Sequence, residues 1–370
     1  MASDQKPKSK PRLEFLDTIR DVLTVLVIYM HTVVAYGGTG KWAYVSKAHP
    51  PNILLEILSA LAQTFYMASF FMISGFFSRM SLDRKPAAEF VRGKLIRLGI
   101  PTVIYTPIVP PLQVAIMQIL LEKKSLEIGI FLDHLRNLEG VKGPVWYCAL
   151  LLIFDCLQAL KVTVAPFRFS EHQPGFTFIL LGIVSAVVVG FCVRIVFPCM
   201  YVWPPLNLRL GFVPQYVAAY ILGISIRNME TWDPLPSPMM WLLSAITTVV
   251  LAVSVATLGD PSAVDTEEVC GGLSGMSASY AVVNETLGYL LFAAVFKLCR
   301  AFANKRSRFS RYAYGAFLLH PLVSVAIEAA LDDWMASAEM KVAVVGTINV
   351  CASWAAAWAL LKVPGMKKVI

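Results

Sequence analysis

An arginine and a histidine eleven positions apart are the residues of this sequence best placed to do chemistry together. Arg20 and His31 lie in the apolar stretch 13–36, where an ionisable side chain is costly unless it is paired, hydrated or functional. In a helix, eleven residues make three turns plus about 20°, so both side chains point the same way, about 16 Å apart along the axis. Arginine suits phosphate and neutral imidazole can take up a proton, so one polar stripe joins an anion-binding group to a candidate general base.

The histidines also have alternative interpretations. A lone histidine such as His31 can also serve only to hold helices together. His320, in the segment FLLHP, is expected to be structural or to line the substrate site. A carboxylate at the depth of His31 could orient its ring, as in hydrolytic triads, and Glu285 and Glu328 are the candidates.

A basic segment, 79–101, offers a candidate anion site. Arg92, Lys94 and Arg97 fall just before or inside the start of an expected helix. Such residues often only anchor a protein at the interior face of a membrane. The functional alternative is a cytosolic site for the phosphates of a cofactor, because arginine can donate to phosphate bidentately.

Composition places these residues in a membrane protein. Hydrophobic residues make up 57% of the 370 residues and charged residues 15%, with a mean hydropathy of +0.65. This is typical of an all-α, polytopic membrane protein and not of a soluble domain. The net charge of +8 does not indicate nucleic-acid binding, because cytosolic loops of membrane proteins collect lysine and arginine. We expect no removable signal peptide.

About ten transmembrane helices are predicted from apolar segments of about 18–25 residues. They lie near 16–37, 52–78, 98–120, 143–161, 176–197, 211–228, 238–258, 280–300, 312–331 and 342–362. The tails and loops that this count places inside hold 22 of the 32 Lys and Arg residues, which predicts that both termini are cytosolic.

The domain organisation follows from the same segments. We expect a disordered basic cytosolic tail at 1–12, one membrane domain at 13–363 and a short cytosolic tail at 364–370. The organelle stays open between the endoplasmic reticulum and the plasma membrane.

Several motifs are excluded or left open. GGTGKW at 37–42 lacks the spacing of a phosphate-binding loop. The seven cysteines contain no CxxC pair and no metal site is expected, but Cys199 and Cys270 fall in predicted exterior loops and could pair.

Five elements resemble the acyltransferase-3 family of integral-membrane acyltransferases. FLDTIRDVLTVLVIYMH is similar to the family's first helix, with its Arg-x10-His hallmark, and FYMASFFMISGFFSRM to its FFxxSGFF helix. KLIRLGIP resembles the RxxRLxxP element with Lys94 replacing the first arginine, and Asp21 stands where a small residue is usual. GPVWYCALLL and RYAYGAFLLHPL complete the series, which resembles the branch of glucan-succinylating and fungal-type membrane acyltransferases.

The resemblance implies transfer of an acetyl or other short acyl group from acyl-CoA, acetyl-CoA above all, to a hydroxyl of a small-molecule metabolite, lipid or glycan. It assigns catalysis to His31 and Arg20 and donor binding to the basic segment. Acyl-CoA is then a substrate, with no bound cofactor, no metal and no nucleic-acid partner. Trp146, in the GPVWYC element, joins His320, Glu285 and Glu328 as a candidate for lining the substrate site.

Two alternative functions are compatible with the same residues. A multi-pass transporter of an organic anion or an acylated glycan would also place charged residues along its pathway. A member of the other large superfamily of membrane acyltransferases would use His320 as its base instead of His31.

Overall fold

The computed structural model describes residues 13–138, 140–164, 173–257, 269–302 and 309–370. Within these ranges the chain is helical, with one isolated bridge between Trp203 and Leu208 and no β-strand. The predicted tail at 1–12 lies outside the described residues. The predicted tail at 364–370 ends in a short helix, α15 (Met366–Val369), that contacts the turn 95–99. The predicted all-α membrane fold is confirmed.

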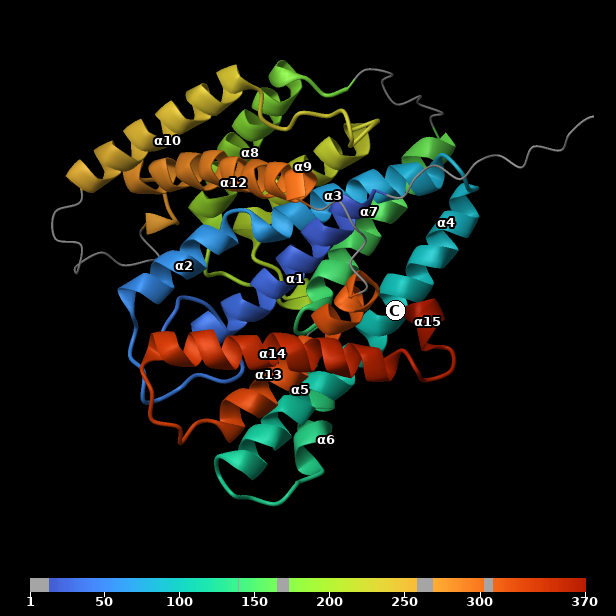
Figure 1. The fold of residues 1–370 in the computed structure, drawn as a ribbon, viewed down its shortest axis with the longest axis vertical. Coiled ribbons are helices and arrows are strands. Elements are labelled where there is room, and N and C mark those ends of the chain that lie inside the picture. The colour runs from blue at the N-terminus through green and yellow to red at the C-terminus, as the bar shows by residue number, and fades with distance from the viewer. Residues whose placement is uncertain (1–12, 139, 165–172, 258–268, 303–308) are drawn as a thin grey trace, which may run out of the picture.

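Nine segments of the described residues are long and apolar enough to cross a bilayer. Their helices are α1 (Glu14–Ala35), α2 (Ile53–Gln63) with α3 (Tyr66–Leu82), α4 (Ala87–Lys94) with α5 (Ile100–Leu120), α7 (Val145–Val164), α8 (Phe176–Val196), α10 (Ser237–Thr257), α12 (Gly275–Phe302), α13 (Ala313–Ala330) and α14 (Ala338–Leu360). Figure 1 shows α1 and α3 in the middle, with α8, α9, α10 and α12 on one side and α5, α13 and α14 on the other. One short helix, α6 (Gly129–Arg136), packs on α5.

The tenth expected segment, 211–228, is a shorter helix than the sequence suggested. Its regular part, α9 (Val213–Ser225), has 13 residues and lies alongside α3. At one end of α9, Gln215 donates to the carbonyl of Thr64, and at the other end Arg79 donates to the carbonyl of Ile224. Because these contacts fall at opposite ends of α3, α9 covers nearly the same depth as its neighbour.

Prolines do not interrupt α5. A π-helical turn (Leu95–Gly99) precedes Pro101, and α5 continues through three further prolines. Pro110 has no N–H to donate to the carbonyl of Thr106, four residues earlier. The Nε2 of His134, on α6, lies 2.9 Å from that carbonyl oxygen and replaces the missing donor. A bilayer supplies no water to do this, so α6 has a structural role.

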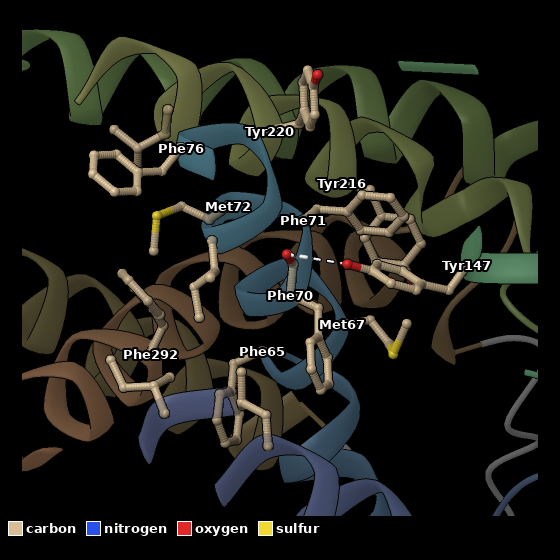
Figure 2. Close-up of a cluster of buried hydrophobic side chains, with 14 of the residues drawn as sticks. Phe65, Met67, Phe70, Phe71, Met72, Phe76, Tyr147, Tyr216, Tyr220 and Phe292 are labelled. Carbon is tan, nitrogen blue, oxygen red and sulfur yellow. Dashed lines mark hydrogen bonds between the residues drawn. The ribbon is translucent and has the colours of Figure 1, made fainter. Parts of the chain in front are cut away.

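The core is built around α3, whose aromatic and methionine side chains point to several helices at once. Figure 2 shows Phe70, Phe71 and Tyr147 packed together, with the Tyr147 hydroxyl donating to the backbone carbonyl of Phe70 at 3.4 Å. Tyr216 of α9 stacks on Phe71 with ring centroids 5.0 Å apart. Interlocked rings of this kind hold α3, α7 and α9 in one rigid unit.

Glycines allow α3 and α9 to pack closely. A Cβ atom on Gly75 would lie 2.5 Å from the carbonyl oxygen of Tyr220, and one on Gly223 would lie 2.0 Å from that of Met72. Small residues at such positions let membrane helices approach each other. This contact explains the glycine in the sequence element FFMISGFF.

Replacing Gly75 by alanine is therefore expected to destabilise the fold, although alanine is the better helix former. Overpacking of this kind typically costs about 1–3 kcal/mol. Thermal unfolding of purified protein in detergent should show a lower Tm for Gly75→Ala. Gly182→Ala is the matched control, because a Cβ on Gly182 in α8 meets nothing within 4 Å. Equal Tm values for both variants would contradict the close contact.

Candidate active site

The imidazole of His31 lies near the C-terminal end of α1, in contact with two other rings. It stacks on the indole of Trp42 with centroids 4.0 Å apart and planes 16° from parallel. On α13, the imidazole of His320 is 5.2 Å away, at 18°. The two histidines that the sequence singled out separately therefore belong to one site. We call this end of the molecule the His31 end, and the opposite end of α1 the Arg20 end.

The connection after α1 turns back to place Trp42 on His31. Gly37 has φ +119°, and a Cβ there would lie 2.7 Å from the carbonyl oxygen of Pro50. Further along, Tyr44 donates a hydrogen bond to Asp332, and His49 Nε2 lies 2.9 Å from the carbonyl of Ala336. The glycines of GGTGKW thus shape a tight turn, and the rest of the connection is fastened to the segment after α13.

Glu328 fixes the edge of the tryptophan that stacks on His31. Its Oε2 accepts a hydrogen bond of 2.7 Å from Trp42 Nε1, and its Oε1 accepts one of 3.2 Å from Asn349 Nδ2. Asn349 also donates to the hydroxyl of Thr32, the residue after His31, at 2.9 Å. Glu328 therefore supports the imidazole through Trp42 and not by direct contact.

His320 is held by a carbonyl group that a proline sets free. Pro321 has no N–H to donate to the carbonyl of Phe317, four residues earlier in α13. His320 Nδ1 lies 2.6 Å from that oxygen, so Nδ1 carries the proton and donates it. This fixes the tautomer. The other nitrogen, Nε2, is buried without a hydrogen-bond partner among the described residues.

A cavity of about 360 Å³ opens beside His31. Its walls come from α1, α2, α3, α5, α7, α9, α13 and three connections. They include Trp146 of α7, one of the residues that the sequence assigned to the substrate lining. Its polar and aromatic lining residues are His31, Thr39, Lys41, Trp42, Ser59, Gln63, Tyr66, Gln113, Trp146, Asn207, Arg209, Tyr216 and Phe317. The volume is at the small end of the range for ligand pockets.

Arg20 lies at the other end of α1, as the helical spacing predicted. Its guanidinium is 38% exposed, 3.8 Å from the buried carboxylate of Asp17 and 5.9 Å from the ring centre of Phe77. The ion pair is long and partly solvated, so the guanidinium keeps donors free for an anion.

An aromatic layer lies between Arg20 and His31. Phe70, Tyr147 and Phe317 come from three helices, and each ring centre is 5.8 Å from the other two. Phe317 faces the cavity beside His31. The layer therefore packs against the cavity through Phe317, on the side of the Arg20 end.

The basic segment divides into two kinds of cation. Lys94 Nζ is 2.8 Å from the fully buried carboxylate of Asp155 and donates to Ser78 at 2.9 Å. Arg92 and Arg97 are exposed instead. Lys94 thus satisfies a buried charge, whereas the two arginines present their guanidinium groups at the surface of the Arg20 end.

Glu285 belongs to a different part of the molecule. It pairs with the fully buried Arg194 at 3.5 Å and accepts a hydrogen bond from Asn284 at 2.9 Å. This carboxylate lines a separate apolar cavity between α3, α8, α9 and α12. The structure therefore does not bring Glu285 to His31, and of the two suggested carboxylates only Glu328 lies at the site.

Sequence reasoning missed the residues that approach His31 from the connections. Trp42 and Arg209 line the cavity, and Asn349 joins the Glu328 network. Trp42 stood inside a motif that was correctly rejected as a phosphate loop. Its place directly after the glycine turn was the one available signal. Among the described residues, no group of three or more His, Cys, Asp and Glu side chains could hold a metal ion.

Cys199 and Cys270 form a disulfide, with Cα atoms 5.7 Å apart. It joins the connection after α8 to the segment before α12. The pairing that the sequence left open is thus present, and it fastens the connection that carries Arg209.

Known proteins share sequence similarity with most of this chain. The family model described as an acyltransferase domain matches residues 13–361. Glucans biosynthesis protein C of Salmonella typhi and that of Salmonella typhimurium are each 34% identical to this chain over 225 residues, and that of Salmonella gallinarum is 27% identical. Each alignment covers 58% of this chain and 58% of the relative's length. No solved structure matches significantly. The match over nearly the whole chain shows that this protein belongs to the acyltransferase-3 family of multi-pass membrane proteins.

Proposed function

We propose that this protein transfers a short acyl group, acetyl or succinyl, from acyl-CoA at its cytosolic face to a hydroxyl of an acceptor bound in the His31 cavity. The single observation that carries the proposal is the cavity with His31 in its wall, on the same helix as a solvent-accessible arginine. The candidate acceptors are glycans, lipids and small metabolites. Relatives named as glucans biosynthesis proteins support a hydroxyl-rich acceptor such as a glycan.

The donor site is proposed at the Arg20 end. Arg20, Arg92 and Arg97 are solvent-accessible guanidinium groups, which suit the phosphates of coenzyme A. Lys94 is committed to Asp155, so we place it in the wall of this site and not on the phosphates. An extended pantetheine arm is comparable in length to the axial distance of about 16 Å between Arg20 and His31.

The pantetheine arm must pass the aromatic layer to bring the thioester to His31. The rings of Phe70 and Phe317 form a tilted contact between α3 and α13, and neither ring makes a hydrogen bond that a change of rotamer would break. Donor binding is thus proposed to part these rings.

His31 acts as the general base in this proposal. The imidazole removes the proton of the acceptor hydroxyl as its oxygen attacks the thioester carbonyl. When the tetrahedral intermediate collapses, the C–S bond breaks and the imidazolium returns the proton to the departing thiolate. Trp42 holds the plane of the imidazole by stacking, so that its ring nitrogens keep a fixed direction.

The topology can be tested by cysteine labelling. We expect both termini and Lys85 on the cytosolic side and Lys47, in the connection after α1, on the exterior side. The free cysteines at 148, 156, 192, 299 and 351 are first replaced, and the disulfide is kept. A membrane-impermeant maleimide applied to sealed cells should then label Lys47→Cys and not Lys85→Cys. The reverse pattern would refute the assigned orientation.

Donor binding tests the role of the basic segment. Arg97→Lys replaces a bidentate fork by a point charge, so the Kd for coenzyme A is expected to rise about tenfold. Arg136→Lys is the control, because Arg136 is 75% exposed on α6 and lies outside the proposed donor site. Titration of purified protein in nanodiscs gives both constants. An unchanged Kd for Arg97→Lys would mean that the segment only anchors the chain.

Replacing His31 by alanine should reduce transfer of labelled acetyl or succinyl groups by about 10²–10⁴-fold while coenzyme A still binds. The assay combines purified protein, each labelled acyl-CoA and extracts that contain hydroxyl acceptors. His320→Ala is the essential comparison, because the buried Nε2 of His320 has no hydrogen-bond partner among the described residues. Activity that survives in His31→Ala and disappears in His320→Ala would make His320 the base. Carriage of solute by the protein without any transfer would favour a transporter.

A further inference from the structure

The cavity beside His31 carries an unbalanced positive charge. Lys41 and Arg209 both contribute to its wall, and none of its described lining residues is an aspartate or a glutamate. Both cations come from connections at the His31 end and not from the donor site at the Arg20 end. A cavity of one charge sign inside a membrane protein attracts a ligand of the opposite sign.

Arg209 is the cation better placed to bind a ligand. It is half-buried and lines the same cavity as the aromatic side chains of Tyr66 and Tyr216. Within the described part of the chain, it has no carboxylate partner at ion-pair distance. A guanidinium that lies among aromatic rings without a counter-ion has unused N–H donors. Two of these donors, side by side in the guanidinium plane, match the two oxygens of a carboxylate.

The two buried glutamates of the surrounding helices, Glu328 and Glu285, have other partners. Glu328 accepts from Trp42 and Asn349 behind the wall of the cavity. Glu285 pairs with Arg194 in a different cavity.

We infer that the His31 cavity binds a carboxylate group, held by Arg209 with Lys41 at the entrance. This inference rests on the proposed function, because the inference names the chemical class of a substrate that binds at the same site. Two sources of the carboxylate are compatible with the cavity: a hydroxy-acid acceptor, or the free end of a dicarboxylic acyl group such as succinyl carried on the donor.

The walls also limit the shape of this ligand. Trp146 and Tyr216, which both line the cavity, form a tilted ring pair with centroids 5.6 Å apart. A volume of about 360 Å³ holds a molecule of roughly one or two rings and not a whole oligosaccharide. A small cyclic hydroxy acid meets both conditions, as does the end of a larger molecule that carries such a group.

The first arm of the test measures binding of a free carboxylate. Purified protein in nanodiscs is titrated with 4-(hydroxymethyl)benzoate and with its neutral methyl ester, and quenching of tryptophan fluorescence reports on Trp42 and Trp146. The acid is expected to bind at least tenfold more tightly than the ester. Arg209→Gln should remove this preference, whereas Lys47→Gln, an exposed lysine of the connection after α1 that lies outside the cavity, should leave it intact.

The second arm measures binding of succinyl-CoA and of the neutral butyryl-CoA, which has an acyl chain of the same length, in a His31→Ala background. A loss of succinyl preference in Arg209→Gln, without a change in the first arm, would assign the carboxylate to the donor. A change in the first arm would assign it to the acceptor. If Arg209→Gln alters neither preference, or if neither probe pair shows one, the inference is overturned. Because both arms measure binding, failure of acyl transfer would not be mistaken for failure of this inference.

Discussion

The buried carboxyl group of Glu328 is the interaction on which the arrangement of the site depends. It joins Trp42 of the connection after α1 to Asn349 of α14, and Asn349 in turn bonds to Thr32 of α1. A carboxyl group with no exposed surface is costly in a membrane domain unless hydrogen bonds satisfy it. The requirement that Glu328 be satisfied therefore fixes three chain segments around His31 at once, including the indole that orients the imidazole.

The same requirement explains two of the histidines outside the proposed chemistry. Pro110 and Pro321 each leave a carbonyl without its helical donor, and His134 and His320 each supply the missing hydrogen bond. For His320 the consequence extends to the site, because donation from Nδ1 leaves Nε2 as the acceptor nitrogen beside His31. A structural need thus sets the protonation pattern of a residue whose ring stacks against His31.

Sequence predicted those parts of the structure that depend on local periodicity. The apolar segments gave the helices, and the helical repeat placed Arg20 and His31 on one stripe because both belong to α1. The 13-residue length of α9 was not predictable, because its apolar run extends beyond the regular helix. Nor could the sequence separate Lys94 from Arg92 and Arg97, since the partner of Lys94 is Asp155, sixty-one positions away. Trp42 and Arg209 reach the His31 cavity only because connections fold back over the helix ends. No periodic pattern in the sequence predicts such a fold-back.

The structure separates the two halves of the proposed reaction by charge and by packing. Guanidinium groups at the Arg20 end face solvent, whereas Arg209 lies half-buried among the rings of the His31 cavity. Between them lie the packed rings of Phe70, Tyr147 and Phe317. A thioester that reached His31 through an open, hydrated channel would be exposed to hydrolysis. Rings that part only around an acyl chain would instead admit the donor and exclude water. The oxygen that attacks the thioester would then come from the acceptor.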